Sequence, residues 1–225
     1  MCCIVACCTA GPSHRDLNSP VRLNVKVLYT QCTLSCDPKD HFVINTVNKD
    51  CVKIRALKTV IVRRHPRRDN AALLDAGGTV FPAFLGRTGR RILKSEGDGA
   101  TPRAMMRVLY GYFRADRIRL PQTRLQMLPI RPDHGWCDAP AHASYNRPVR
   151  LPFAFSHEKM MRDDSLYDIC LVLDWNIGER RRHRGSAIFL HLSEGRTTEG
   201  CVAISRRAML WLLPRLRRNT VIQVV

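Results

Sequence analysis

The sequence predicts a mainly β fold with a few short helices. Short apolar segments rich in β-branched residues recur along the chain, separated by Gly, Pro and charged residues, as is typical of strands. One segment near the C-terminus follows a helix start signal. Strands do not alternate with long helices, so the pattern excludes a parallel α/β sheet. A chain of 225 residues is long enough for one sizeable domain.

The first half of the globular pattern consists of strands and turns. The expected elements are a strand at 59–64 (TVIVRR), a hairpin at 73–89 turning at Gly77-Gly78, a loop at 94–104, and a strand or short amphipathic segment at 105–114. Residues 121–152 are rich in Pro, Arg and aromatic residues, which predicts a long irregular stretch. Such stretches inside a domain usually carry function.

The second half contains the strongest strand signals. Apolar runs predict strands at 166–176 (LYDICLVLDWN) and 186–192 (SAIFLHL), with a basic turn between them. A short strand is expected at 201–204 (CVAI) and a last one at 220–225 (TVIQVV). Between these two, Ser205 is placed to cap a helix over 206–216, which Pro214 ends or kinks.

Residues 1–56 differ from the rest, and we expect them to form a poorly ordered N-terminal extension to a domain at 57–225. Seven of the ten cysteines lie there: Cys2, Cys3, Cys7, Cys8, Cys32, Cys36 and Cys51. A uniform disulfide scaffold would spread them more evenly. No pair with ligand spacing follows Cys32 and Cys36, so we predict no metal site. No signal peptide and no membrane-spanning run of about 20 apolar residues is recognisable.

The formal net charge of +18 predicts attraction to polyanions such as nucleic acid, anionic membranes or anionic cell-wall polymer. The basic residues are spread along the chain, and aromatic residues do not alternate with them as in a single-strand binding groove. We therefore expect no specific nucleic-acid partner, although a basic nucleic-acid-binding protein remains a rival class.

His191 ends an apolar run, and Cys201 begins the next one after a Gly-containing loop. If the loop folds back between adjacent strands, the imidazole can act as a base for the thiol. The N–H groups around Gly200 and Cys201 would then be placed to stabilise an oxyanion. Alternatively, Cys201 is a small buried core residue. The spacing alone leaves both interpretations open.

The segment 185-GSAIFLHLSEGRTTEGCVAIS-205 resembles the active-site signature of the L,D-transpeptidase catalytic domain family (YkuD type), in the bacterial branch with a T-E-G-C-V-A motif. The resemblance extends back to about residue 59. Further matching stretches are 96-EGDGATP-102, 130-IRPDHGWCDAP-140, 145-YNRPVRLP-152, 157-HEKMMRDDSLYD-168 and 172-VLDWN-176. The family implies a β-sandwich or barrel with a few short helices.

By this resemblance, Cys201 is the nucleophile, His191 the general base and Gly200 part of the oxyanion region, with the Leu192 carbonyl or Ser193 orienting the base. Glu199 stands where many members have a second histidine, and the loop before it is shorter than the usual form. The resemblance also suggests substrate contacts, namely Tyr145, Asn146, Arg147 and Glu199. We further expect His157 and Glu158 to cap a helix or contact substrate.

The implied reaction is acyl transfer between peptidoglycan stem peptides, without a cofactor. A Cys201 thioester forms as D-Ala leaves, and a second stem then closes a 3–3 cross-link. Such a reaction would serve peptidoglycan synthesis, cell-wall biogenesis and cell shape. The alternatives are an L,D-carboxypeptidase and a catalytically impaired basic wall-binding module. We expect a monomer in the periplasm or cell envelope.

Overall fold

The computed structural model describes residues 54–225, so the predicted extension over 1–56 lies almost wholly outside the described residues. The described elements are β1 (Thr59–His65), β2 (Arg68–Ala76), β3 (Thr79–Phe84), β4 (Arg90–Arg91), β5 (Thr101–Pro102), β6 (Met105–Phe113), β7 (Met127–Pro129), β8 (His134–Cys137), β9 (Arg147–Arg150), β10 (His157–Lys159), β11 (Ile169–Leu173), β12 (Phe189–Leu192), β13 (Val202–Ile204), α1 (Arg206–Leu212), the 3-10 turn η1 (Leu213–Arg215) and β14 (Val221–Val224). The fold is mainly β, as the sequence predicts.

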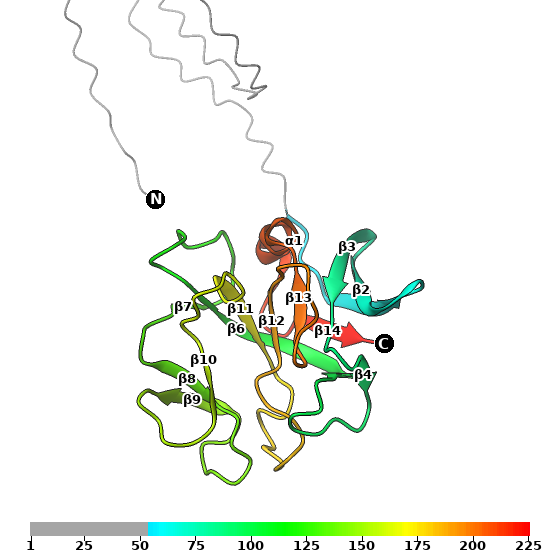
Figure 1. The fold of residues 1–225 in the computed structure, drawn as a ribbon. Helices are drawn as coiled ribbons and strands as arrows, with labels where there is room; N and C mark the ends of the chain where they lie inside the picture. The colour runs from blue at the N-terminus through cyan, green and yellow to red at the C-terminus, as the bar shows by residue number, and fades with distance from the viewer. Residues whose placement is uncertain (1–53) are drawn as a thin grey trace, which may run out of the picture. The chain divides into compact units, whose positions relative to one another are not determined.

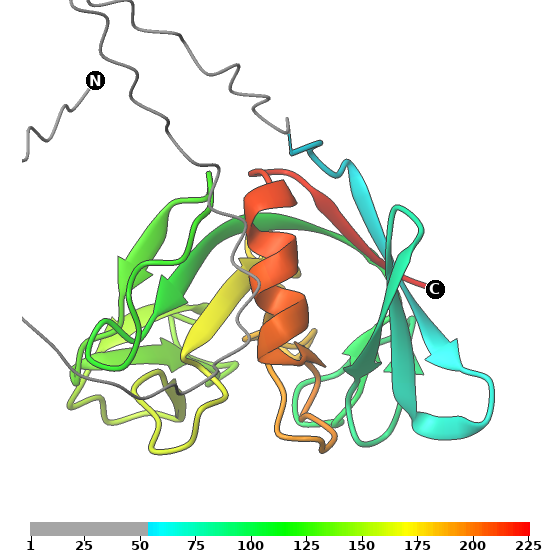
Figure 2. The same ribbon diagram turned by 90° about the horizontal axis from the view of Figure 1, so that it is seen from above.

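Eight strands of mixed direction close into a barrel (Figures 1 and 2). Their order is β11-β12-β13-β3-β2-β1-β14-β6, and the pairing of β6 with β11 completes the ring. β7 pairs in parallel with the C-terminal part of β6, whereas β14 pairs with the N-terminal part of β6. Closure removes the open sheet edges that would otherwise expose unpaired backbone groups.

The predicted hairpin at Gly77-Gly78 is confirmed. β2 and β3 pair up to Ala76 and Thr79, which leaves the two glycines as the loop, with φ values of 69° and 92°. Two residues with positive φ match the turn that suits the twist of a hairpin, and glycine adopts it without steric cost. The first and last strands, β1 and β14, pair in parallel, so the beginning and the end of the described domain lie side by side.

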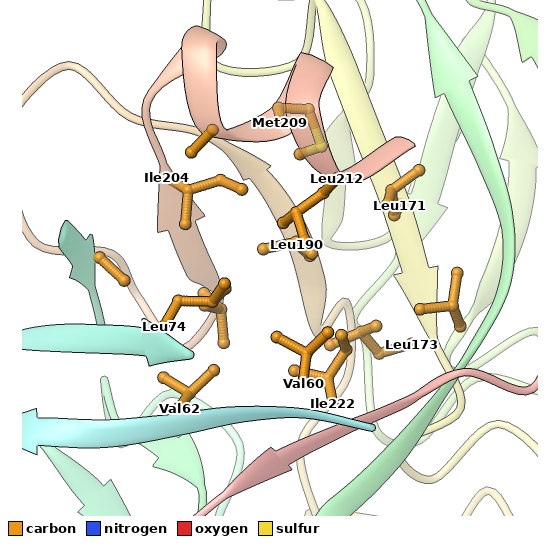
Figure 3. Packing of buried hydrophobic residues seen from close by; sticks show 14 of the residues in the cluster. Val60, Val62, Leu74, Leu171, Leu173, Leu190, Ile204, Met209, Leu212 and Ile222 are labelled. Atoms are coloured by element: carbon orange, nitrogen blue, oxygen red, sulfur yellow. The ribbon is translucent and has the colours of Figure 1, made fainter. Parts of the chain in front are cut away.

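The main core lies between the barrel strands and α1 (Figure 3). It brings together Val60 and Val62 of β1, Leu171 and Leu173 of β11, and Leu190 of β12, against Met209 and Leu212 of the helix. β11, β12 and β13 are buried at every position. Burial on both faces explains why these segments are continuous apolar runs in the sequence and do not alternate with polar residues.

The predicted C-terminal helix is confirmed, and it ends close to Pro214, which was expected to end or kink it. Ser205 caps it as predicted, because the Ala208 N–H donates to Ser205 Oγ over 3.2 Å. The α-helix ends at Leu212 and passes into η1, which contains Pro214. Proline lacks an N–H group and its ring clashes with the preceding turn, so a regular α-helix does not continue through it. No helix among residues 54–225 is long and apolar enough to cross a membrane.

Residues 121–152 are more regular than predicted. They contain β7, β8 and β9, and β8 forms a three-stranded sheet with β9 and β10. His157 and Glu158 lie within β10, so the expectation that they cap a helix is wrong. Trp136 of β8 packs edge-on against Phe189 of β12 at a ring-centroid distance of 5.2 Å. This contact fixes the small sheet over a second apolar cluster, the one that contains Cys201.

Candidate functional site: a thiol and an imidazole in one pocket

His191 and Cys201 lie on adjacent parallel strands. In the register of β12 and β13, Leu190 stands opposite Val202 and His191 opposite Ala203, and Cys201 directly precedes β13. Side chains two residues apart on a strand point to the same face. Cys201 and Ala203 therefore share a face with His191, and the loop at 193–200 returns the chain from the end of one strand to the start of the other.

The short loop is held by the segment after β3. The Arg87 N–H donates to the Thr198 carbonyl over 2.8 Å, and the Thr198 N–H donates to the Leu85 carbonyl over 2.9 Å. The Arg87 guanidinium also pairs with Glu199 at 2.8 Å on the surface. Two backbone bonds thus fix the position of Thr198, three residues before the cysteine.

Gly200 has a backbone conformation that favours glycine. Its φ is 145°, and a Cβ placed there would lie 3.0 Å from the Ala100 carbonyl oxygen. The Gly200 N–H donates to Thr198 Oγ1 over 3.2 Å, so it is engaged within the loop. The glycine therefore contributes its conformation, which sets the direction of the Gly200–Cys201 peptide.

The Cys201 side chain is buried, with 8% of its surface exposed. Its Sγ accepts a hydrogen bond from the Phe189 N–H (3.3 Å) and donates one to the Ala187 carbonyl (3.2 Å). Its own carbonyl accepts from the hydroxyls of Thr198 (2.7 Å) and Thr101 (3.1 Å). Burial raises the pKa of the thiol to about 12, which the Phe189 N–H partly opposes. The resting sulfur is therefore a neutral thiol.

His191 is also buried, with 4% of its surface exposed. Its Nδ1 lies 2.7 Å from the Leu192 carbonyl oxygen, which can only accept, so Nδ1 carries the proton and Nε2 is left as an acceptor. The Tyr167 ring packs edge-on against the imidazole at 5.3 Å. Burial lowers the pKa of His191 to about 4. The imidazole is therefore neutral at physiological pH and has a lone pair available on Nε2.

Both side chains line one pocket of about 530 Å³, a volume suited to a small peptide or a similar ligand. The pocket's charged lining residues are Glu96, Asp138, Glu158, Arg162, Arg196 and Glu199. Other lining residues are Gly200, Thr198, Ser186 and Ala187, whose carbonyl contacts the sulfur.

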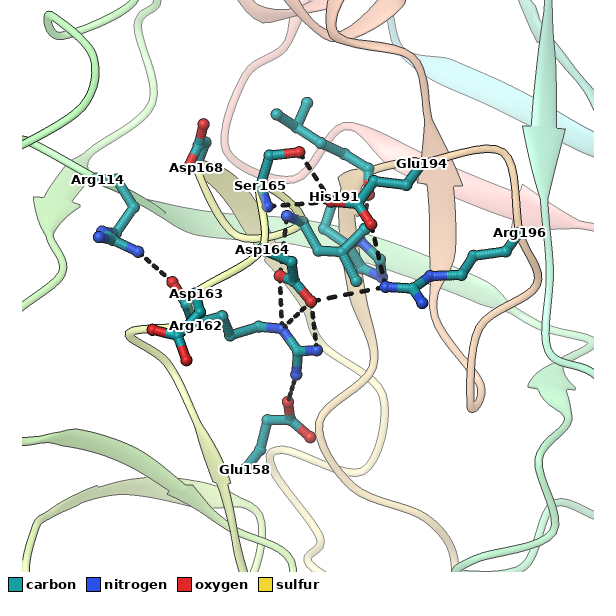
Figure 4. A network of polar contacts seen from close by, with 12 residues as sticks. Arg114, Glu158, Arg162, Asp163, Asp164, Ser165, Asp168, His191, Glu194 and Arg196 are labelled. Atoms are coloured by element: carbon teal, nitrogen blue, oxygen red, sulfur yellow. Dashed lines mark hydrogen bonds and ion pairs between the residues drawn. The ribbon is translucent and has the colours of Figure 1, made fainter.

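A network of ion pairs lies beside His191 (Figure 4). Arg162 bridges Glu158 at 2.9 Å and Asp164 at 2.7 Å, and Arg196 pairs with Glu194 at 3.0 Å. Burial raises the pKa of Glu158, and the Arg162 guanidinium opposes that shift. Arg196 also lies 3.7 Å from Asp164, and this contact ties the loop after β12 to the segment after β10.

The predicted substrate contacts are not brought together. Of the four residues, Glu199 lines the pocket, whereas Tyr145, Asn146 and Arg147 lie outside its lining. The Tyr145 hydroxyl donates to Glu96, a pocket residue. Asn146 is buried and bonded to its neighbours within the protein. Arg147 is exposed at the start of β9.

Four residues that hydrogen-bond with Cys201 were not singled out from the sequence, namely Thr101, Ala187, Phe189 and Thr198. Thr101 lies within a stretch that matches the family, and Thr198 belongs to the T-E-G-C-V-A motif, so both carried a signal. Ala187 and Phe189 lie within the matching stretch 185–205, but each contributes a backbone group, and the direction of the Ala187 carbonyl depends on an unusual φ of 50°.

Residues 59–224 match the YkuD L,D-transpeptidase catalytic domain, and the chain therefore belongs to this family. The match spans β1 to β14, so it includes every strand of the barrel. The family consists of L,D-transpeptidases, enzymes that act on peptidoglycan.

Among solved structures, L,D-transpeptidase 1 of Mycobacterium tuberculosis is similar at 13% sequence identity, with a TM-score of 0.32. The match covers 74% of this chain and 62% of that chain, so this chain spans less than two thirds of the other's length. No curated protein matches this chain.

Proposed function

We propose that this chain is a peptidoglycan L,D-transpeptidase in which Cys201 is the nucleophile and His191 the general base. The observation that carries the proposal is that both side chains line one pocket from adjacent strands, while the bond to the Leu192 carbonyl fixes the imidazole tautomer. Membership of the family supports stem peptides as the substrate class.

Acylation proceeds through a tetrahedral intermediate. The Cys201 sulfur attacks the carbonyl carbon of the third residue of a donor stem, and its proton passes to His191 Nε2. Because both groups are neutral at rest, the proton leaves the sulfur as the C–S bond forms. The C–N bond to the terminal D-Ala then breaks, and the imidazolium protonates the leaving amine.

Deacylation follows the same course, with the amine of a second stem as the nucleophile. Its side-chain amine attacks the thioester carbonyl, the C–S bond breaks, and the amine proton returns to the Cys201 sulfur through His191. The product is a 3–3 cross-link. If water is the acceptor, the same thioester gives a tripeptide, and the enzyme acts as an L,D-carboxypeptidase.

The oxyanion of each tetrahedral intermediate needs an N–H donor near the sulfur. Since the Gly200 N–H donates to Thr198, we assign this role to the Cys201 N–H, with Gly200 orienting the peptide. Glu199 and Arg162 give the pocket charges of both signs, which suit a stem peptide that carries ammonium and carboxylate groups. Tyr145 lies outside the pocket lining, and we assign it an indirect role through its hydrogen bond to Glu96, which lines the pocket.

The proposed catalytic domain is 57–225, and its substrate implies action in the cell envelope. The formal net charge of +18 supports attraction to anionic wall polymers, and this attraction weakens as salt is added.

The test is a tetrapeptide assay. With a tetrapeptide stem as donor, wild type should release D-Ala and form a cross-linked dimer, both detected by mass spectrometry. Cys201→Ala should abolish release. His191→Gln should lower kcat by about 10²- to 10⁴-fold, the usual contribution of a general base.

Cys137→Ala serves as the matched control, since Cys137 is a buried thiol of β8 outside the pocket. It should retain the activity of wild type. Tripeptide without dimer would assign the carboxypeptidase alternative. If folded wild type releases no D-Ala but binds peptidoglycan, the proposed enzymatic activity is overturned, and the wall-binding module is the remaining alternative.

A further inference from the structure

The Cys201 thiol donates a hydrogen bond to a backbone carbonyl whose residue has an unusual backbone conformation. The acceptor, Ala187, has a φ of 50°, in the left-handed region that side chains other than glycine rarely adopt. An alanine there costs about 1 kcal/mol relative to glycine, so something must hold it in place.

Asn146 provides that hold. Its Oδ1 accepts from the Ala187 N–H at 3.1 Å and from Trp136 Nε1 at 3.0 Å, and its Nδ2 donates to the Trp175 carbonyl at 3.0 Å. The side chain is 1% exposed, and its own φ is 57°. One amide thus joins β8, the segment after β11 and the segment before β12.

We propose that Asn146 is a positioning residue for Cys201: by fixing Ala187 in its left-handed conformation, it aims the Ala187 carbonyl at the thiol and keeps the resting nucleophile protonated. This inference rests on the proposed function, in which Cys201 attacks. The thiol must leave the Ala187 carbonyl before His191 can accept its proton, so Asn146 sets how readily the nucleophile is released.

The contact has an electrostatic consequence. A carbonyl oxygen 3.2 Å from the sulfur stabilises the S–H form and repels a thiolate. Other titratable groups that face the sulfur are Lys94, Glu158, Arg162, Tyr167 and Cys170, and His191 lines the same pocket. Changing Asn146 alters none of these residues.

The test is the pH dependence of Cys201 alkylation by iodoacetamide, with the modified peptide identified by mass spectrometry. The thiolate displaces iodide as the S–C bond forms, so the rate follows the thiolate fraction. In Asn146→Ala, the midpoint of the pH profile should fall by about one unit, so alkylation of Cys201 below the midpoint should be about tenfold faster.

A loosened pocket would speed alkylation at every pH and leave the midpoint unchanged, and that result would overturn the proposal. Ala187→Gly sharpens the distinction, because glycine adopts positive φ without help. Added to Asn146→Ala, it should restore the midpoint toward that of wild type. A midpoint that stays low in the double variant would contradict a role through Ala187.

Asn219→Ala is the matched control, since it removes an exposed asparagine with a φ of 71° far along the chain from the site. Its profile should match wild type. If Asn146→Ala does not fold, the infrared difference spectrum between wild type and Cys201→Ser isolates the S–H band of Cys201. Its position tests the contact with the Ala187 carbonyl, on which the proposal depends. A band at the position of a free thiol would contradict the contact with Ala187.

Alkylation requires no stem peptide, so it is independent of the tetrapeptide assay. If wild type releases D-Ala but the alkylation midpoint of Asn146→Ala is unchanged, the positioning role alone is rejected. If Asn146→Ala shows the expected midpoint shift but wild type releases no D-Ala, the proposed activity alone is rejected.

Discussion

At the scale of single residues, burial decides the resting state of the candidate site. It raises the pKa of Cys201 and lowers that of His191, so a preformed thiolate–imidazolium pair is not the ground state. The hydrogen bonds of the site fix its geometry: the Leu192 carbonyl fixes the tautomer of His191, and the hydroxyls of Thr101 and Thr198 hold the Cys201 carbonyl.

Gly200→Ala tests the geometry of the loop. A φ of 145° and the contact of a Cβ with the Ala100 carbonyl at 3.0 Å should cost about 1–3 kcal/mol of stability. The strain lies next to Cys201, so acylation should also slow. Urea unfolding and tetrapeptide turnover measure the two effects.

Gly178→Ala is the control for this substitution, because a Cβ at Gly178 would meet nothing within 4 Å. Equal stability of Gly200→Ala and Gly178→Ala would contradict the strained conformation of Gly200.

The sequence identified His191 and Cys201 as a candidate pair because their motif resembles that of a family. It did not separate Asn146 from Tyr145 and Arg147, since adjacent residues of one stretch share the same match. Only the three-dimensional placement distinguishes them: Asn146 bonds to Ala187, whose orientation depends on a backbone angle that no sequence pattern reports.

At the scale of elements, the parallel pairing of β12 and β13 places the site. The register puts Cys201 and His191 on one face, and the opposite face packs on the main core and α1. Any shift of β13 by one residue would turn Cys201 to the other face. The helix α1 follows β13 directly and packs its buried residues Ala208, Met209 and Leu212 on the main core.

Ser205→Ala tests the cap of this helix. Loss of the bond from the Ala208 N–H to Ser205 Oγ should cost about 1 kcal/mol of folding free energy. Urea unfolding monitored by circular dichroism measures it. Ser205→Asp, which retains a capping acceptor, should recover most of the loss, and failure to recover it would contradict the capping role.

Elements with strong local signals were predicted from the sequence, including the hairpin at Gly77-Gly78, the strands at β11 and β12, and the cap at Ser205. The small sheet of β8, β9 and β10 was not. Its strands have three or four residues each, and they are stabilised by contacts distant in sequence, such as Trp136 with Phe189. No local pattern specifies such strands.

At the scale of the whole molecule, the buried site makes stability depend on pH. The unfolded chain binds a proton at His191 near pH 6.5, whereas the folded protein does so near pH 4. Stability should therefore fall as pH drops through this interval. The thiol acts in the opposite range, since its raised pKa costs stability as pH rises from about 9 toward 12.

The predicted loss attributable to His191 between pH 7 and pH 4.5 is about 2–3 kcal/mol. Urea unfolding of wild type and His191→Gln at both pH values measures it, and the variant should lose less by that amount. His183→Gln, on an exposed turn, should behave as wild type does. Parallel pH curves for wild type and His191→Gln would contradict a neutral buried imidazole.

The central claim is that Cys201 carries the acyl group. Intact-protein mass spectrometry of wild type, incubated with a tetrapeptide stem and no acceptor, tests it most directly. The account predicts a mass increase equal to the tripeptide acyl group, located on the Cys201 peptide and absent from Cys201→Ala. Release of D-Ala without an adduct, or an adduct on another residue, would contradict it.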